Sequence, residues 1–343
     1  MIGPHPEEPT EGRRLEGCLR SAAIHAFANG DANWLRPLLG NMAAIMADID
    51  WSSLTIGMLG GDAREREIAR LAALTGAAVR AHGFPWPERG IPGVTHLDDP
   101  AAVLRGARFA LFPIPGIAAN GALFAPAAAK PIVPTRDMLA GMAARAHIIL
   151  GWADANLKSH AEALGIAIHE YEWDRALMLR RAPAIIEGLL RIAIENTDIT
   201  IHDANVCVVG HGTIGAALVR TLVALGAHVH VAARNAEQCA AAYVAGAKPH
   251  ALAELPELAP RLDMMFSTVP SRIVGSDVLA RLPTSALVVD LAAPPGGIDL
   301  EAAKRRGLKA IWGRGLGSRA PVTVGASQWG GIRERIETIL RDP

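Results

Sequence analysis

The stretch Val206-Cys-Val-Val-Gly210-His-Gly212-Thr-Ile-Gly215-Ala-Ala-Leu-Val-Arg220 decides the fold of this chain. Its apolar start is typical of a buried strand, and the pattern Gly-x-Gly-x-x-Gly follows directly before an amphipathic helix. Gly210 permits a tight turn, Gly212 lets the backbone approach a pyrophosphate, and Gly215 lets the helix pack closely on the strand. The helix N-terminus offers N–H groups and partial positive charge to phosphates. The sequence therefore predicts a dinucleotide site that comprises Gly210, Gly212, Thr213, Ile214 and Gly215. The alternative is a glycine-rich turn that has only a structural role.

The residues after the next expected strand, 227–233, indicate which dinucleotide binds. An acidic residue there would bind the ribose hydroxyl of NAD, but Arg234 and Asn235 stand in its place. A guanidinium suits a 2′-phosphate, so NADP is favoured; in the alternative Arg234 is a solvated turn residue and NAD binds. Thr268, Val269 and Pro270 end a later strand and are expected at the edge of the same crevice.

The alternation of apolar strands with amphipathic helices extends in both directions from the motif. It indicates strands at 54–61, 77–83, 108–115, 147–152 and 166–171 before the motif, and at 227–233, 262–270, 286–294 and 309–313 after it. Alternating strands and helices are typical of parallel sheets covered on both faces. The sequence therefore predicts two doubly wound α/β domains joined by a long helix.

The expected boundaries follow changes in this rhythm. A helical extension is expected at 1–50, an α/β substrate domain at 51–182, a linking helix beginning at Pro183 with its connector to 202, and a dinucleotide domain at 203–317. The tail, 318–343, is expected to form a helix that could return to the first domain.

Composition narrows the function classes. The 343 residues suffice for two sizeable cores, and 34 Lys and Arg balance 34 Asp and Glu, so nucleic-acid binding is not expected. The three cysteines have no metal-ligand spacing, and no histidine pair suggests zinc, so no metal is expected. The start lacks an export signal and the longest apolar stretch is broken by proline and glycine, which favours the cytoplasm and no membrane span.

Arginines are the candidates for binding substrate carboxylates, because a planar guanidinium binds both oxygens at once. Arg180 and Arg181 are expected just before the linking helix, where an anionic ligand would relieve their repulsion by the helix dipole. Two solvated arginines are the alternative. Arg314 and Arg319 flank a glycine-rich loop after the last strand, at the carboxyl edge where α/β proteins bind ligands.

Further candidates lie on the helices that flank the expected substrate site. Glu187 could accept a proton or orient an arginine, but its spacing with Arg191 and Glu195 equally predicts a surface ion-pair ladder. Asp62 and Arg64, in the glycine turn after the first strand, could contact substrate or belong to the start of the next helix. Capping is favoured for Asp62.

Several segments together carry a family resemblance: Gly60-Gly-Asp-Ala-Arg64, Glu195-Asn-Thr-Asp-Ile-Thr-Ile-His202, Val231-Ala-Ala-Arg-Asn235 and Asp290-Leu-Ala-Ala-Pro-Pro-Gly-Gly297. With them the chain resembles the family of the dipicolinate synthase A subunit over roughly residues 55 to 335. The resemblance implies a flavodoxin-like N-terminal domain, an NADP-binding Rossmann C-terminal domain and a cleft in which dihydrodipicolinate is oxidised. It also implies a partner, a separate B-type subunit, and a homo-oligomer is expected.

The chain departs from the family pattern near the expected substrate site. Arg180-Arg-Ala-Pro-Ala184 stands where the family has Asn-Ser-Ile-Pro-Thr, and Val322 replaces a lysine. The loop Pro113-Ile-Pro-Gly-Ile-Ala-Ala-Asn120 lacks the family's acidic residue. Two alternatives stay open: a dehydrogenase of another carboxylated or imino acid, and a nucleotide-binding subunit that serves a partner without turnover of its own.

Overall fold

The structure is a computed structural model that describes residues 49–118, 120–172 and 174–341. One compact unit, Trp51–Glu334, contains both sheets. The helical extension expected at 1–50 lies outside the described residues except for its last two positions, and so does Cys18.

The first half of the compact unit forms a parallel sheet with helices between its strands. Its strands follow the order β3-β2-β1-β4-β5-β6. Without β3 this is the 2-1-3-4-5 order of flavodoxin-like sheets, and β3 extends that order by one edge strand. The elements are η2 (Trp51–Ser53), β1 (Thr55–Leu59), α3 (Ala63–Ala73), β2 (Ala78–His82), β3 (Val94–His96), α4 (Pro100–Leu104), β4 (Phe109–Leu111), α5 (Arg136–Ala140), β5 (His147–Leu150), α6 (Ala155–Ala163) and β6 (Ala167–Glu170).

The second half repeats this architecture after a long helix. Its strands follow the order β12-β11-β10-β7-β8-β9, all in parallel, which is the order of dinucleotide-binding sheets. The two doubly wound sheets confirm the predicted fold class. The elements are α7 (Arg175–Asn196), β7 (Asn205–Val209), α8 (Thr213–Ala224), β8 (His228–Ala233), α9 (Ala236–Val244), β9 (Lys248–Ala251), η3 (Leu252–Glu254), α10 (Leu255–Leu258), η4 (Ala259–Arg261), β10 (Met264–Ser267), α11 (Ser276–Leu279), β11 (Leu287–Asp290), α12 (Leu300–Arg305), β12 (Lys309–Trp312), η5 (Leu316–Arg319) and α13 (Pro321–Arg341).

The linking helix α7 begins earlier than predicted. The Asp174 side chain accepts hydrogen bonds from the N–H groups of Ala176 and Leu177, at 2.9 and 3.1 Å, and thereby caps the helix before Arg175. Pro183, expected at the first helical position, therefore lies inside α7. A proline inside a helix removes one backbone hydrogen bond, but buried side chains on both sides of it hold the helix against its neighbours.

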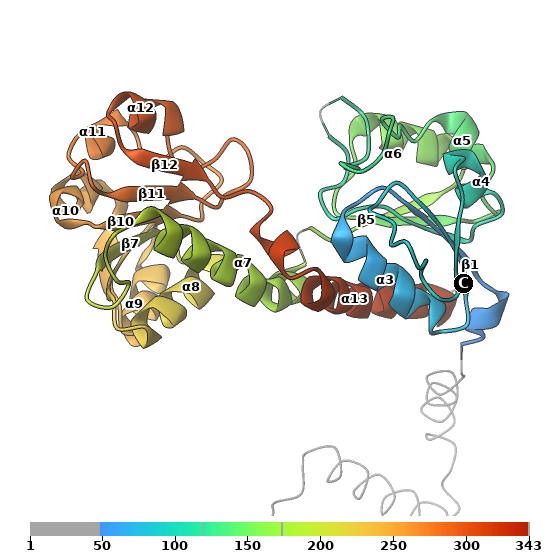
Figure 1. Cartoon of the computed structure of the whole chain (residues 1–343), viewed down its shortest axis with the longest axis horizontal. Helices are drawn as coiled ribbons and strands as arrows, with labels where there is room; N and C mark the ends of the chain where they lie inside the picture. Colours follow the sequence, from blue (N-terminus) through green and yellow to red (C-terminus); the bar gives the residue numbers. More distant parts are fainter. Residues whose placement is uncertain (1–48, 119, 173, 342–343) are drawn as a thin grey trace, which may run out of the picture. The chain divides into compact units, whose positions relative to one another are not determined.

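Two apolar layers cover the second sheet. One includes Ile186 and Leu189 of α7 with Leu218 and Leu222 of α8. The opposite layer is built from residues of α10, α11 and α12, so that in Figure 1 α7 and α8 lie on one face of the sheet and α11 and α12 on the other. This packing fixes the N-terminus of α8 at the carboxyl end of β7.

The first part of α13 packs on elements of the first half. A Cβ added at Gly325 would lie 2.6 Å from the backbone oxygen of Arg64, so only glycine permits this approach to α3. The rings of Trp329 and Trp51 have centroids 6.0 Å apart. Among the helices of the described residues, none is both long and apolar enough to span a membrane.

Candidate functional site

The turn between β7 and α8 is closed by two glycines. Gly210 has a φ of +94°, and a Cβ there would lie 2.5 Å from Val269 Cγ2 and 2.8 Å from Thr268 Oγ1. A Cβ at Gly215 would lie 2.3 Å from the carbonyl oxygen of Gly210. Neither position has room for a side chain, and α8 therefore starts directly against the end of its strand.

The remaining glycine of the turn, Gly212, faces open space. A Cβ at Gly212 would meet no heavy atom within 4 Å, and its φ of −85° is open to any residue. Gly212 is the N-cap of α8, and no side chain caps the helix. The first N–H groups of a helix lack partners within the helix. The turn thus has the space, the donors and the helix dipole that fit a dinucleotide pyrophosphate.

The corresponding turn of the first sheet is closed by its own acidic side chains. Asp62 accepts from the N–H of Arg64 at 3.0 Å, and Glu65 accepts from the N–H of Asp62 at 2.7 Å, which completes a capping box. Arg64 is buried and donates two 2.8 Å hydrogen bonds to Asp62. Asp62 is thus a cap, as favoured, and Arg64 is its partner. Only the second of these two turns fits an anion.

Burial shifts the acid–base behaviour of the first turn. The pKa of Glu65 is raised from 4.5 to about 7, mainly by burial, while the charge of Arg64 opposes the shift. Nearby Tyr171 also has its pKa raised by burial. These groups lie at the carboxyl end of the first sheet, and their burial separates them from solvent.

Arg234, the residue predicted to determine whether NADP or NAD binds, directly follows β8. Arg234 is exposed and makes no hydrogen bond or ion pair to any residue that the structure describes. Asn235 instead caps α9, because its Oδ1 accepts from the N–H of Gln238 at 2.9 Å. The free guanidinium is therefore available to a phosphate, whereas the Asn235 oxygen already serves the fold.

The end of β10 borders the glycine turn. Thr268 Oγ1 donates to the carbonyl oxygen of Val209 at 3.2 Å, and Val269 packs over Gly210. Pro270, which follows them, is exposed. The structure thus places Thr268 and Val269 beside the predicted pyrophosphate turn.

The loop after β11 is held by one buried carboxylate. Asp290 accepts hydrogen bonds from the N–H groups of Ala292, Gly297 and Ile298 at 3.0, 2.7 and 3.0 Å. A Cβ at Gly297 would lie 2.1 Å from Ser267 Oγ, so the loop also packs on the end of β10. Asp290 therefore acts as the anchor of residues 291–298.

The candidate arginines of α7 have different surroundings. Both lie inside the helix, so the prediction that they precede it is wrong, because Asp174 caps α7 earlier in the chain. Arg181 is buried, and its Nη1 lies 3.2 Å from Glu172 Oε2. Arg180 is exposed, and a Cβ at Gly330 would lie 3.3 Å from its Nη1. The pairing of Arg181 is that of a structural residue.

The structure brings two other candidates together. Glu187 of α7 and Arg319 of η5 form an ion pair, so Glu187 binds this arginine rather than Arg191. The predicted ladder survives only between Arg191 and Glu195, at 3.7 Å. Arg314, just after the end of β12, lies over the ring of Trp312, 5.2 Å from the ring centre. Trp312 could not be identified from the sequence, because nothing in the pattern distinguishes it from an ordinary strand residue.

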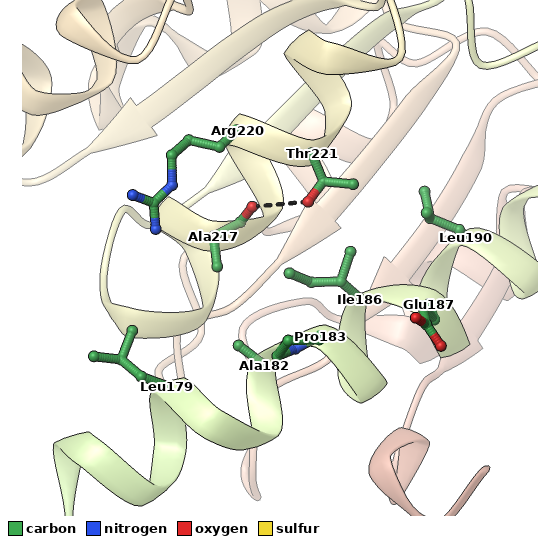
Figure 2. Close-up of a pocket in the computed structure, with 9 residues that line it drawn as sticks. All are labelled: Leu179, Ala182, Pro183, Ile186, Glu187, Leu190, Ala217, Arg220 and Thr221. Carbon is green, nitrogen blue, oxygen red and sulfur yellow. Dashed lines mark hydrogen bonds between the residues drawn. The ribbon is translucent and has the colours of Figure 1, made fainter. Parts of the chain in front are cut away.

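A pocket of about 410 Å³ lies between α7 and α8 (Figure 2). Figure 2 shows Arg220 and Glu187 on opposite sides of a mostly apolar lining formed by Leu179, Ala182, Pro183, Ile186, Leu190 and Ala217, to which Thr221 adds a hydroxyl group. Within this lining, Thr221 Oγ1 donates to the Ala217 oxygen at 3.1 Å, a bond inside α8. The uncapped start of α8 and Thr268 lie instead at the carboxyl ends of β7 and β10, and this is the candidate site. Within the described residues, no group of three or more His, Cys, Asp or Glu side chains could hold a metal ion.

Two protein families match separate stretches of the chain. The family of the N-terminal domain of the dipicolinate synthase A subunit matches residues 55–172, and the family "Shikimate / quinate 5-dehydrogenase" matches residues 191–310. The A subunit of dipicolinate synthase from Bacillus subtilis (strain 168) is 31% identical over 276 residues, which are 80% of this chain and 93% of that protein.

Solved structures show the same fold. The crystal structure of the dipicolinate synthase A subunit from Bacillus halodurans matches with a TM-score of 0.76 and 29% identity, over 81% of this chain and 96% of that chain. A transhydrogenase from Sinorhizobium meliloti matches with a TM-score of 0.62 and 16% identity, over 83% of this chain and 94% of that chain. The latter likeness is one of fold.

Proposed function

The chain belongs to the family of the dipicolinate synthase A subunit, and we propose that it is an NADP-dependent oxidoreductase acting on dihydrodipicolinate or a related small dicarboxylate. Its family and its dehydrogenase-like fold support an oxidoreductase that uses a nicotinamide cofactor. The substrate, the choice of NADP and the roles of individual residues are parts of the proposal.

The observation that carries the proposal is the uncapped start of α8 at Gly212. The chain closes the matching turn of its first sheet with Asp62 and Glu65, yet this one has no side-chain cap, and a Cβ added at Gly212 would meet no heavy atom within 4 Å. An uncapped N-terminus at the carboxyl end of a parallel sheet favours a phosphate ligand. We infer that Gly212, Thr213 and Ile214 bind the pyrophosphate there, with Thr268 and Val269 at its edge.

The choice of NADP rests on Arg234. Its side chain follows β8, where the adenine ribose of a dinucleotide lies in this fold, and it forms no ion pair in the described part of the chain. A guanidinium without a partner attracts a 2′-phosphate and gains much less from a 2′-hydroxyl.

The substrate is proposed to bind at the ends of β11 and β12. NADP, when bound, accepts a hydride from the substrate, and oxidation of a dihydropyridine ring to the aromatic ring releases one proton as well. Arg314 and Arg319 supply cations for the two carboxylates, and Glu187 orients Arg319 through their ion pair. This pairing supports the orienting role of Glu187 over that of a proton acceptor, and the proton then leaves to water.

A second substrate is favoured by one observation. Arg181 is buried against Glu172, and Val322 is exposed at the start of α13, so two positions at which the chain departs from its family carry no free cation. Another carboxylated or imino acid is therefore the alternative.

Partners and location complete the proposal. We propose a B-type partner, since the relatives are named as one of the subunits of a synthase, and a homo-oligomer. We also propose a cytoplasmic location, where Cys207 and Cys239 stay free thiols.

The proposal is tested by binding and turnover together. Purified protein is titrated with NADPH and with NADH, and is then supplied with NADP and, in turn, dihydrodipicolinate, other dicarboxylates and imino acids. We expect tighter binding of NADPH and the highest kcat/KM for dihydrodipicolinate. Turnover only of another acid would establish the alternative substrate, and tight NADPH binding without any turnover would indicate a non-catalytic role beside a partner.

A further inference from the structure

Trp312 lies where the loops after two neighbouring strands meet. It is the last residue of β12, and its indole N–H donates to the carbonyl oxygen of Ala292 in the loop after β11, at 3.0 Å. A Cβ at Gly296 of that loop would lie 3.8 Å from Trp312 Cζ2, so the indole rests against the loop. The residue nevertheless keeps 38% of its surface exposed. The indole N–H of Trp312 thus fixes the ring, while the exposed part of the ring can contact another side chain.

The support beneath this ring is rigid. Asp290 binds three N–H groups of the loop through its carboxylate, and its backbone oxygen accepts from the N–H of Gly313 at 2.8 Å. The residue that anchors the loop after β11 thus also fixes the chain directly after Trp312. Asp290 therefore holds both the loop after β11 and the chain beside Trp312.

Arg314 lies over the exposed face of the Trp312 ring. Its guanidinium carbon lies 5.2 Å from the ring centre, and its backbone N–H donates to the Trp312 oxygen at 2.9 Å. The guanidinium makes no ion pair and no hydrogen bond to any of the residues that the structure describes. An aromatic face attracts the cation but uses few of its five N–H donors. The donors that point away from the ring stay available to a carboxylate.

Two other candidate arginines are each paired with an acidic residue. Arg319 is paired with Glu187, and Arg181 with Glu172. Arg314 differs from both, because an aromatic ring rather than an acid holds it in place. Its positive charge is thus oriented without being neutralised by an acidic residue.

We propose that Trp312 is a positioning residue, which holds Arg314 ready to bind one carboxylate of the substrate. The inference rests on the proposed function, in which Arg314 contacts a dicarboxylate. Trp312 acts through Arg314: its ring limits the rotamers of the arginine, and its indole N–H keeps the ring on the loop after β11. Substrate binding then costs less side-chain entropy than with a freely moving arginine.

The test measures binding of pyridine-2,6-dicarboxylate, the aromatic product of the proposed reaction, to the NADPH-loaded full chain by calorimetry. The variants are Arg314→Gln, Trp312→Leu, Trp312→Phe and the double variant Trp312→Leu/Arg314→Gln. Lys309→Ala is the matched control, because Lys309 lies at the other end of β12 and donates to the Asn196 oxygen at 3.0 Å. NADPH affinity and the thermal unfolding midpoint report whether each variant is folded.

We expect Arg314→Gln to weaken binding about tenfold or more, and Trp312→Leu to weaken it about two- to fivefold. Trp312→Phe should stay within about twofold of the parent, because a phenyl face still attracts the cation. The double variant should bind no more weakly than Arg314→Gln alone. A second readout is KM against kcat: Trp312→Leu should raise KM and leave kcat nearly unchanged.

The outcomes separate this inference from the proposed function. If Arg314→Gln binds the dicarboxylate as the parent does, the proposed carboxylate contact is wrong and the inference with it. If Arg314→Gln binds weakly while Trp312→Leu matches the Lys309→Ala control, only the positioning role is overturned. Losses that add fully in the double variant would also overturn it, since Trp312 would then act independently of Arg314.

Discussion

The Cα of Gly215 lies so close to Gly210 that an added Cβ would stand 2.3 Å from the Gly210 carbonyl oxygen, whereas a Cβ at Gly212 would meet nothing within 4 Å. The fold thus requires a glycine at Gly215 but leaves room for a side chain at Gly212. The difference allows folding and cofactor binding to be tested separately.

We predict that Gly212→Ala folds like the parent but weakens NADPH binding about tenfold or more, because the methyl group enters the space of the pyrophosphate. Gly215→Ala should instead lower the free energy of unfolding by about 1–3 kcal/mol, since α8 must shift away from β7. Urea unfolding and fluorescence titration with NADPH measure the two effects. A Gly212→Ala variant with parental affinity would contradict the placement of the phosphate.

Cofactor preference should depend on Arg234. We expect Arg234→Ala to weaken NADPH about tenfold or more while NADH changes less than about twofold, because only NADPH carries the 2′-phosphate that a charged donor binds. Parallel titrations with both nucleotides measure this. Equal losses would show that Arg234 does not contact the phosphate.

Asp290 should be essential to the loop after β11. Asp290→Ala leaves the N–H groups of Ala292, Gly297 and Ile298 without their acceptor inside the protein. We expect a loss of about 3 kcal/mol or more in unfolding free energy, and a smaller loss for Asp290→Asn, which keeps one carbonyl acceptor. Urea unfolding checks both variants, and equal stability of Asp290→Ala and the parent would refute the anchoring role.

Stability should fall as the pH rises through neutrality because of Glu65. Its pKa is raised by burial from 4.5 to about 7, so the folded protein holds a proton that the unfolded chain has released. This contribution is complete below about pH 4.5 and is lost as the pH rises through about 7.

Glu65→Gln removes the titration and keeps an oxygen that can accept from the Asp62 N–H. We expect the variant to exceed the parent in stability by about 1–3 kcal/mol at pH near 8 and to lose the advantage at pH near 5. Thermal unfolding across this range is the measurement, with the exposed Glu162→Gln as control. A constant difference between Glu65→Gln and the parent at all pH values would contradict the assignment.

The two neighbouring arginines of α7 should behave differently. Arg181→Ala is expected to lower the free energy of unfolding by about 2 kcal/mol, because Glu172 loses a buried partner. Arg180→Ala should leave stability near that of the parent, since its side chain is exposed. Urea unfolding and KM are compared for the two single variants. A stable Arg181→Ala variant with a raised KM would return Arg181 to the substrate site.

The sequence was sufficient to predict the central strands of both sheets but not the edge strands β3 and β9. The central strands are apolar runs, and their alternation with helices predicts both parallel sheets. The edge strands β3 and β9 were missed because they are short and polar, and β9 contains Pro249, which an edge strand tolerates. The predicted start of α7 at Pro183 is wrong because proline is typical of a first turn, whereas the Asp174 side chain caps the helix earlier in the chain.

The cofactor turn was predictable because it is local, and the substrate side was not. Gly210, Gly212 and Gly215 are close in sequence, and their roles follow from spacing alone. The pairs Glu187 with Arg319 and Trp312 with Ala292 join distant segments, and only the fold brings them together. The Asp62-x-x-Glu65 pattern is one signal that could have identified the capping box from the sequence.

The most direct test of the central claim is NADPH formation by the purified full chain supplied with NADP and freshly generated dihydrodipicolinate, with NADPH binding measured in the same preparation and Gly212→Ala as the folded control. We predict that the parent forms NADPH and that Gly212→Ala forms at least about tenfold less at limiting NADP. NADPH formation by Gly212→Ala at the parental rate, or no formation by a parent that binds NADPH, would contradict it.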